Sequence, residues 1–178
     1  MTINELKSTL PVYAKDIKLN LGSVLSEEGA PGLTEKQIVM IALGSAYATK
    51  EKTLITSTTE TASELLTAEE VLGVKGATTI MAMNNVYYRF SHLVSDKSYG
   101  TMPAKLRMNV MANSGIAKID FELISLAVSA IEGCGLCIDS HVSVIVKHGI
   151  SKEGVQSTIR IASTFNAAAQ ALDIERNE

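Results

Sequence analysis

The chain has no tryptophan and only three prolines, and aromatic residues make up 4% of its 178 residues. β-Sandwiches and barrels rely on aromatic and β-branched residues in their strands, so this profile argues against them. Methionine is plentiful instead, as is alanine, the residue with the highest helix propensity. We therefore expect a compact all-α protein, and the length indicates a single domain over residues 1–178.

The chain also has no excess of basic residues, since it contains 16 Lys and Arg and 19 Asp and Glu. Phosphate binding needs a concentrated basic face, so we expect no nucleic-acid partner. The most apolar run, Leu123–Ile131, is interrupted by Ser125 and Ser129 and is too short to span a membrane. Residues 1–5 contain neither a basic region nor an apolar signal core, so we expect a cytoplasmic protein.

Cysteine is scarce, and both cysteines lie in one motif, Cys134-Gly135-Leu136-Cys137. Thiols stay reduced in the cytoplasm, so a purely structural disulfide is not the first expectation. The chain also lacks a phosphate-binding glycine loop and a dinucleotide fingerprint, which excludes an evident nicotinamide or flavin site. If the protein does redox chemistry, its electrons therefore arrive through thiols on another molecule.

Apolar periodicity and capping residues predict a series of helices joined by short loops. The segment 53–66, rich in Thr and Ser, is less regular, and residues 29–32 and 95–103 are expected to be loops. Helices are predicted over residues 2–21 (divided near Pro11), 34–46, 67–73, 78–90, 105–111, 120–131 (capped by Asp120), 134–147 and 151–172.

The two halves of the sequence show weak similarity at an offset of 84 residues. At this offset Ser45 pairs with Ser129. The pattern suggests an internal duplication with pseudo-repeats at about 34–90 and 118–174. Lys50, Thr53 and Ser57 then stand where the second repeat has Cys134, Cys137 and His141, so only the second repeat carries the reactive side chains.

On one helix, Cys134, Cys137 and His141 fall at positions i, i+3 and i+7, which share a face. A helix N-terminus favours the thiolate of Cys134, and His141 lies one turn beyond Cys137, where it is placed to accept a proton. Glu122 stands near the start of the preceding helix. If the two helices pack antiparallel across Gly133, Glu122 approaches His141 and orients it.

The same residues allow other interpretations. Cys134, Cys137, His141 and Glu122 together offer four ligands for zinc, although two thiolates on one helical turn suit a redox pair better. Glu122 alone is equally explained as a first-turn acid that the helix dipole favours. His92 and His148 have no comparable neighbours, and the methionines, which include Met81, Met108 and Met111, are expected to fill the core or a subunit interface.

The motif Glu122, eleven residues, Cys134-x-x-Cys137, three residues, His141 resembles that of the alkyl hydroperoxidase D family. This family belongs to the wider carboxymuconolactone decarboxylase-like group. The segments 10–21, 81–89 and 106–109 also resemble the family, so the similarity extends over nearly the whole chain.

The resemblance implies an all-helical fold, usually a homotrimer, and an antioxidant, thiol-dependent alkyl hydroperoxide reductase. In that family pattern Cys137 attacks the peroxide and becomes a sulfenic acid. Cys134 resolves it as an intramolecular disulfide and exchanges with the partner, and Glu122 and His141 form a proton relay. The implied partner is a peroxiredoxin of the alkyl hydroperoxide reductase C type. The resemblance further implies that the protein binds no cofactor and that electrons come from dihydrolipoamide on a lipoylated acyltransferase, which lipoamide dehydrogenase reduces.

One position departs from the family, since some members have histidine before the second motif cysteine and this chain has Leu136. The chain thus lacks a possible extra proton carrier or surface contact, and this bears on the rate more than on the reaction. Two other activities stay open: a thiol–disulfide adaptor with little direct peroxidase activity, and a ring-opening lactone decarboxylase as in the wider group. The decarboxylase reaction needs no dithiol, which argues against it.

Overall fold

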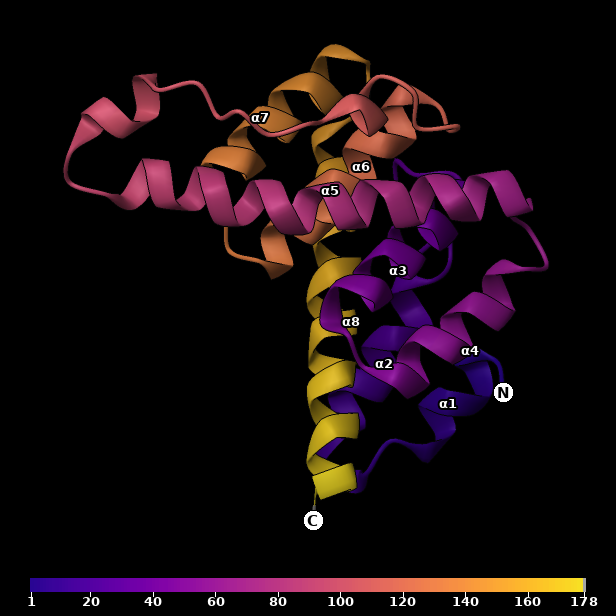
Figure 1. The fold of residues 1–178 in the computed structure, drawn as a ribbon. Helices are drawn as coiled ribbons and strands as arrows, with labels where there is room; N and C mark the ends of the chain where they lie inside the picture. Colours follow the sequence, from indigo (N-terminus) through magenta and orange to yellow (C-terminus); the bar gives the residue numbers. More distant parts are fainter. Residues whose placement is uncertain (178) are drawn as a thin grey trace.

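A computed structural model describes residues 1–177, and within them it contains eight α-helices and no β-strand. The prediction of an all-α fold is confirmed. Three short 3-10 helices, η1 to η3, complete the chain (Figure 1). The elements are α1 (Ile3–Thr9), η1 (Val12–Ala14), α2 (Lys15–Val24), α3 (Glu35–Thr49), α4 (Lys52–Ala62), α5 (Ala68–Leu93), η2 (Lys97–Thr101), η3 (Asn109–Met111), α6 (Lys118–Ile131), α7 (Gly135–Lys147) and α8 (Lys152–Asn177).

Several helix boundaries agree with the sequence signals. Pro11 separates α1 from α2, and Thr34 caps α3 in a reciprocal capping box with Gln37. α7 begins directly after Cys134, as predicted, and ends at Lys147. Residues 53–66, predicted to be less regular, overlap α4, which spans Lys52–Ala62. Its threonine hydroxyls donate hydrogen bonds to backbone carbonyls one turn earlier, so their polarity is satisfied within the helix.

The prediction that a short helix ends near Gly73 is wrong. Thr67 and Glu70 form the expected capping box, but α5 continues without interruption for 26 residues to Leu93. The helix contains a glycine at position 73 because Ile116 packs closely against it: a Cβ atom on residue 73 would lie 2.5 Å from Cγ2 of Ile116. A glycine required for close approach looks, in sequence alone, the same as one that ends a helix.

Three smaller predictions also need correction. Only Asn109–Met111 of the expected helix 105–111 forms, as a 3-10 turn, because Lys105 adopts a positive φ of 53°. Asp120 does not cap α6, which begins at Lys118; its carboxylate instead accepts a hydrogen bond from Nε2 of Gln37 at 2.9 Å. The last helix extends beyond residue 172 to Asn177.

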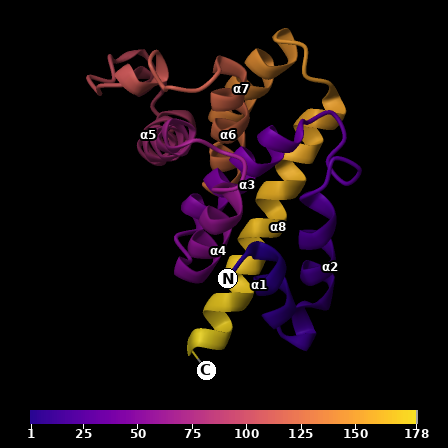
Figure 2. The same ribbon diagram turned by 90° about the vertical axis from the view of Figure 1, so that its right-hand side faces the viewer.

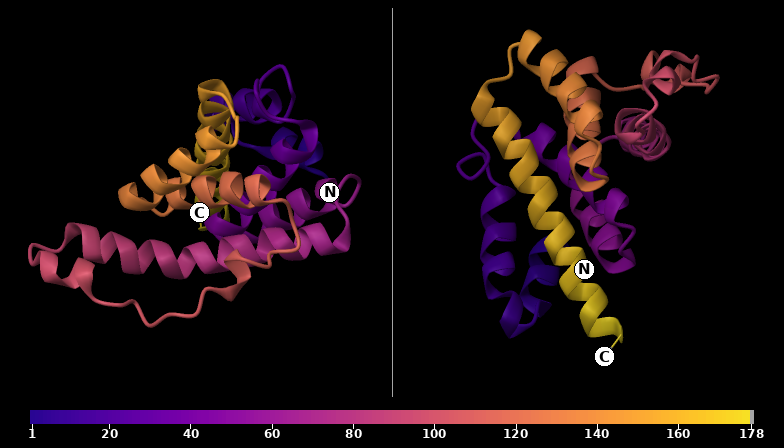
Figure 3. Two further views of the ribbon diagram at one scale, coloured as in Figure 1. Left: turned by 90° about the horizontal axis from the view of Figure 1, so that it is seen from above. Right: turned by 90° about the vertical axis from the view of Figure 1, so that its left-hand side faces the viewer.

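Helices α3, α6 and α8 pack together at the centre, and α5 lies across them (Figure 1). Figure 2 shows α5 along its axis, and the segment that contains η2 lies beside it. Gly44 permits the close crossing of α3 and α6, since a Cβ atom there would lie 2.7 Å from Cγ2 of Ile124. α1 and α2 cover the opposite side of α8 from α5 (Figure 3). No described helix has the length and apolar character needed to cross a membrane.

The order of helices repeats, since α3–α4–α5 and α6–α7–α8 each end in a 26-residue helix. α5 begins at residue 68 and α8 at residue 152, 84 positions later, whereas α3 and α6, and likewise α4 and α7, begin 83 positions apart. The helix starts thus align Glu51, and not Lys50, with Cys134, because these two residues precede α4 and α7. The internal duplication itself stays a prediction.

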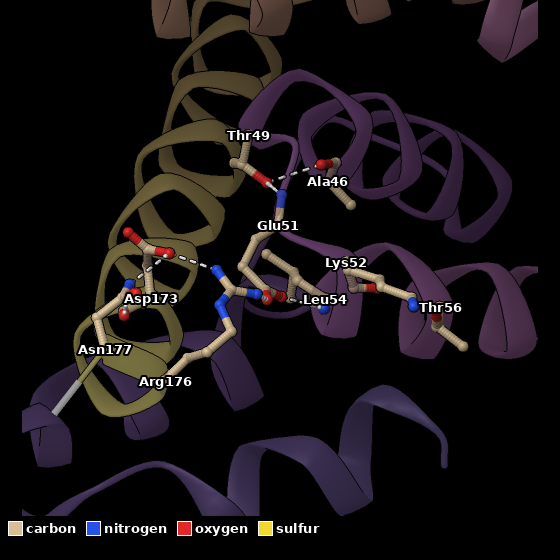
Figure 4. Close-up of polar contacts among 9 residues, drawn as sticks. All are labelled: Ala46, Thr49, Glu51, Lys52, Leu54, Thr56, Asp173, Arg176 and Asn177. Atoms are coloured by element: carbon tan, nitrogen blue, oxygen red, sulfur yellow. Dashed lines mark hydrogen bonds and ion pairs between the residues drawn. The ribbon is translucent and has the colours of Figure 1, made fainter.

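Glu51 shows what the first half contains in place of the cysteine. Its carboxylate is buried and accepts the backbone N–H of Leu54 at 2.6 Å, which caps α4. The other carboxylate oxygen pairs with Nη1 of Arg176 at 2.8 Å, and Asp173 also contacts Arg176 (Figure 4). This cluster therefore ties the end of α8 to the start of α4 and has no reactive sulfur.

Candidate active site

The two cysteines lie at a sharp break between α6 and α7. Gly133 has a φ of 71°, a value that glycine adopts without strain, and the chain reverses there. Arg89 of α5 donates a hydrogen bond to the backbone carbonyl of Glu132 and so supports the turn. Cys134 caps α7: the backbone N–H of Cys137 lies 3.3 Å from its Sγ atom. The break thereby places the sulfur of Cys134 at the positive end of a helix.

Cys134 and Cys137 form a disulfide, with their Cα atoms 5.3 Å apart. This is the intramolecular disulfide that the family resemblance implies. The two residues differ in their surroundings. Cys134 is completely buried, whereas 7% of Cys137 is exposed and lines a cavity. A small molecule in that cavity therefore meets Cys137 and not Cys134.

A buried acid–imidazole pair lies beside the disulfide. Nδ1 of His141 on α7 is 2.7 Å from Oε2 of Glu122 on α6, and both side chains are more than nine-tenths buried. Lys118, one turn before Glu122, forms an ion pair with its other carboxylate oxygen. Burial by itself raises the pKa of Glu122, but the hydrogen bonds from His141 and Lys118 outweigh it, so the pKa lies below its ordinary value. Glu122 is therefore charged at neutral pH.

This pairing determines what the imidazole can do. With Nδ1 held by Glu122, Nε2 is the ring nitrogen left for a substrate or a water molecule. His141 follows Cys137 by four residues on the same helix, so the two side chains share a face. An imidazole fixed by a carboxylate and placed beside a thiol is suited to take and return a proton.

The cavity beside Cys137 has a volume of about 310 Å³ and is mostly apolar. A few polar side chains in an otherwise apolar lining are typical of a small-molecule site. The cavity opens between α5, η3 and α7, and its lining residues are Met81, Asn84, Tyr88, Met108, Met111, Leu136, Cys137, Ser140 and His141.

Comparison with known proteins identifies relatives over almost the full length. An alkyl hydroperoxide reductase AhpD of Coxiella burnetii (strain RSA 493 / Nine Mile phase I) is 53% identical over 169 residues, which cover 95% of this chain and 96% of the relative. A protein of the same name from Maricaulis maris is 50% identical over 175 residues, which cover 98% of this chain and 99% of the relative. Another from Hyphomonas neptunium is 48% identical over 175 residues, which cover 98% of this chain and 96% of the relative. The chain belongs to the AhpD family. The carboxymuconolactone decarboxylase family model also matches residues 98–175.

Membership of the AhpD family confirms the resemblance inferred from the motif and the expected enzyme class, an oxidoreductase. Glu122, Cys134, Cys137 and His141 all lie within the segment that the family model matches. The tertiary structure brings these four residues together at the α6–α7 break. Their individual roles in catalysis are taken up below.

Sequence reasoning assigned no role to two residues at this AhpD site. Asn84 is 4% exposed, lines the cavity, and has a side-chain oxygen with no hydrogen-bond partner among the described residues. Asn84 follows Met81 by three residues and precedes Tyr88 by four, so the sequence did indicate that these three side chains share one face of a helix. Lys118 was missed because the start of its helix was placed two residues too late, which hid its i, i+4 relation to Glu122.

The other two histidines lie apart from the acid–imidazole pair, whereas the predicted methionines lie close to it. His148 ends α7, where its Nδ1 is 2.8 Å from the carbonyl oxygen of Val144. His92 lines a separate cavity that also touches Leu136. Met81, Met108 and Met111 line the space beside Cys137, so they are more than core filler. Within residues 1–177 no three His, Cys, Asp or Glu side chains are grouped as a metal site requires.

Proposed function

We propose that this protein reduces alkyl hydroperoxides with the Cys134–Cys137 dithiol. The observation that carries the proposal is that Cys137 lines an apolar cavity together with His141, whose ring is held by Glu122. An alkyl chain fits the apolar walls, and the peroxide group then lies among Cys137, His141 and Asn84. The names of the relatives, alkyl hydroperoxide reductase AhpD, support this substrate class.

The first step is attack by the Cys137 thiolate on the terminal oxygen of the hydroperoxide. A sulfur–oxygen bond forms and the oxygen–oxygen bond breaks, which gives a sulfenic acid and an alkoxide. His141, protonated by the thiol of Cys137 at the start, returns that proton to the alkoxide, so an alcohol leaves. The Glu122 carboxylate stabilises the imidazolium while it carries the proton.

In the second step Cys134 resolves the sulfenic acid. Its sulfur attacks the Cys137 sulfur, and the hydroxyl group leaves as water after taking up the Cys134 proton. The disulfide present in the structure is the product of this step. The enzyme has then delivered two electrons to the peroxide and needs two from outside.

Reduction of the disulfide completes the cycle. We propose that the electron donor in this step is dihydrolipoamide, which is carried by a lipoylated acyltransferase and regenerated by lipoamide dehydrogenase. We also propose that the restored dithiol reduces a peroxiredoxin of the alkyl hydroperoxide reductase C type. Cys134 is completely buried, so a partner's sulfur reaches it only after the segment around residue 134 moves. A protein that acted only as an adaptor would gain from an exposed sulfur, and this favours direct peroxide reduction.

We further propose that the protein works in the cytoplasm as a homotrimer. Val86, Phe90 and Leu93 are more than half exposed and share one face of α5. Large apolar side chains grouped on one exposed face are typical of a subunit interface. Light scattering on the purified protein measures the assembly, and a monomeric mass contradicts the trimer.

The experiment that tests the activity counts thiols. One equivalent of cumene hydroperoxide is added to the reduced, metal-free protein, and the remaining thiols are followed with time. We expect both thiols of each chain to be lost without intermolecular disulfides, and Cys137→Ser to abolish peroxide consumption. Cys134→Ser is the matched variant, and it is expected to accumulate a sulfenic acid that dimedone traps. Peroxide consumption that survives in Cys137→Ser refutes the assignment, and thiols that stay unreacted favour the adaptor.

A further inference from the structure

A second cavity, of about 570 Å³, adjoins the one beside Cys137. Tyr88 and Leu136 line both cavities, so the two spaces share these side chains as a common wall. Leu136 is 42% exposed and stands at the start of α7, at the boundary of the two cavities. A chain-like ligand that occupies both cavities therefore has to pass Leu136.

The two cavities differ in polarity. Met81, Met108 and Met111 make the first cavity apolar, whereas the second contains Lys97 and His92 and the hydroxyl groups of tyrosine and serine side chains. No acidic side chain is among the described residues that line the second cavity. A ligand that spans both is thus apolar near Cys137 and negatively charged or polar at its far end.

The ammonium group of Lys97 is held in place at the end of α5. Its Nζ atom donates hydrogen bonds to the carbonyl oxygens of His92 at 2.9 Å and Val94 at 3.1 Å. An ammonium group has three hydrogens, so one stays available for a ligand. The nearest acid in sequence, Asp96, accepts the backbone N–H of Ser98 and does not line the cavity.

The distance between the two ends suits an acyl chain. Asn84 lines the first cavity and His92 the second, and both lie on α5, so about 12 Å of helix separates them at 1.5 Å per residue. A medium-length acyl segment spans this distance. Val86 and Leu93, which we assign to the trimer interface, lie on the other face of α5 from the cavities. Phe90 packs edge-on against Tyr99 of the second cavity wall, with the ring centroids 5.4 Å apart.

We propose that the preferred substrate is a fatty-acid hydroperoxide that lies in both cavities. Its hydroperoxide group meets Cys137 and His141, its chain passes between Tyr88 and Leu136, and its carboxylate pairs with Lys97. The inference rests on the proposed function, because the chemical step is the same: the fatty-acid hydroperoxide is reduced to the hydroxy acid and the dithiol is oxidised to the disulfide.

The test compares an unsaturated fatty-acid hydroperoxide with its methyl ester, both below the concentration at which they form micelles and with dithiothreitol as electron donor. The wild-type protein is expected to have a kcat/KM roughly fivefold higher for the acid, the factor that one partly exposed ion pair supplies. Lys97→Gln is expected to remove this preference. Lys52→Gln, the same change at an exposed position on α4, is the matched control and keeps the preference. An acid preference that is absent in the wild type or unchanged in Lys97→Gln overturns the inference.

A second variant tests the passage itself. Leu136→Trp places a larger side chain at the boundary between the cavities. It is expected to lower kcat/KM for the long-chain acid about tenfold more than for tert-butyl hydroperoxide, since the smaller ligand stays in the first cavity. An equal effect on both substrates contradicts the inference. Turnover of tert-butyl hydroperoxide by the wild type separates the two proposals, because its absence refutes the proposed function, whereas its presence without an acid preference refutes only the fatty-acid assignment.

Discussion

The carboxylate of Glu122 and the imidazole of His141 form a buried pair 2.7 Å apart, although the residues lie on different helices and 19 positions apart in sequence. The pair fixes which ring nitrogen faces Glu122 and leaves the other for the reaction. Lys118 supports it from the first turn of α6. The arrangement extends a one-helix motif of Cys134, Cys137 and His141 into a three-dimensional site.

Replacing Glu122 by Gln is expected to lower the rate of peroxide reduction by about 10- to 100-fold, since the charge that stabilises the protonated imidazole is lost. Stopped-flow measurement of sulfenic acid formation in a Cys134→Ser background isolates this step. Glu153→Gln, at an exposed position in the first turn of α8, is the control and should react like its parent. A rate within twofold of the parent in Glu122→Gln removes the residue from the relay.

The low pKa of Glu122 predicts a pH-dependent contribution to stability. A carboxyl whose pKa is lower in the folded state stabilises the fold above its unfolded pKa, near the ordinary value of 4.5, and loses this contribution as the pH falls through the folded value. The stability difference between the wild type and Glu122→Gln should therefore shrink below pH 4.5. Urea unfolding from pH 7 downward measures it, and a difference that is constant with pH contradicts the prediction.

Asn84 is expected to bind the peroxide group through its side-chain amide. Asn84→Ala should lower kcat/KM for alkyl hydroperoxides roughly tenfold, the effect of one hydrogen bond of about 1.4 kcal/mol. The rate at which dithiothreitol reduces the disulfide should not change, and this separates a role in binding from a general disturbance of the fold. Asn166→Ala, at an exposed position on α8, is the control. Equal losses in both half-reactions point to a structural role.

Gly44 is expected to tolerate no side chain, because a Cβ atom there would lie 2.7 Å from Cγ2 of Ile124 at the crossing of α3 and α6. Gly44→Ala should lower the free energy of unfolding by about 1–3 kcal/mol, the usual range for overpacking. Gly100→Ala is the matched control, since no atom lies within 4 Å of its Cβ position. Chemical denaturation of both variants measures the difference, and equal stabilities would show that the α3–α6 crossing adjusts without cost.

The class of fold and the reactive motif could both be predicted from the amino-acid sequence. The scarcity of aromatic residues is a matter of composition, and it can be read without a structure. The capping signals at Thr34 and Thr67 depend only on local interactions, so they too could be recognised from the sequence. The shared face of Cys134, Cys137 and His141 follows from helix periodicity alone. The predicted end of the helix at Gly73 was wrong because this glycine is required by the close approach of Ile116, a residue distant in the sequence.

The surroundings of that motif, in contrast, depend on how the helices pack. Local spacing left the role of Glu122 open, and the packing of α6 against α7 brings its carboxylate to His141. The burial of Cys134, the exposure of Cys137 and the cavity walls supplied by Asn84 and Tyr88 depend on where α5 crosses the other helices. These features arise from contacts between residues far apart in the chain, and such contacts have no local pattern from which to predict them.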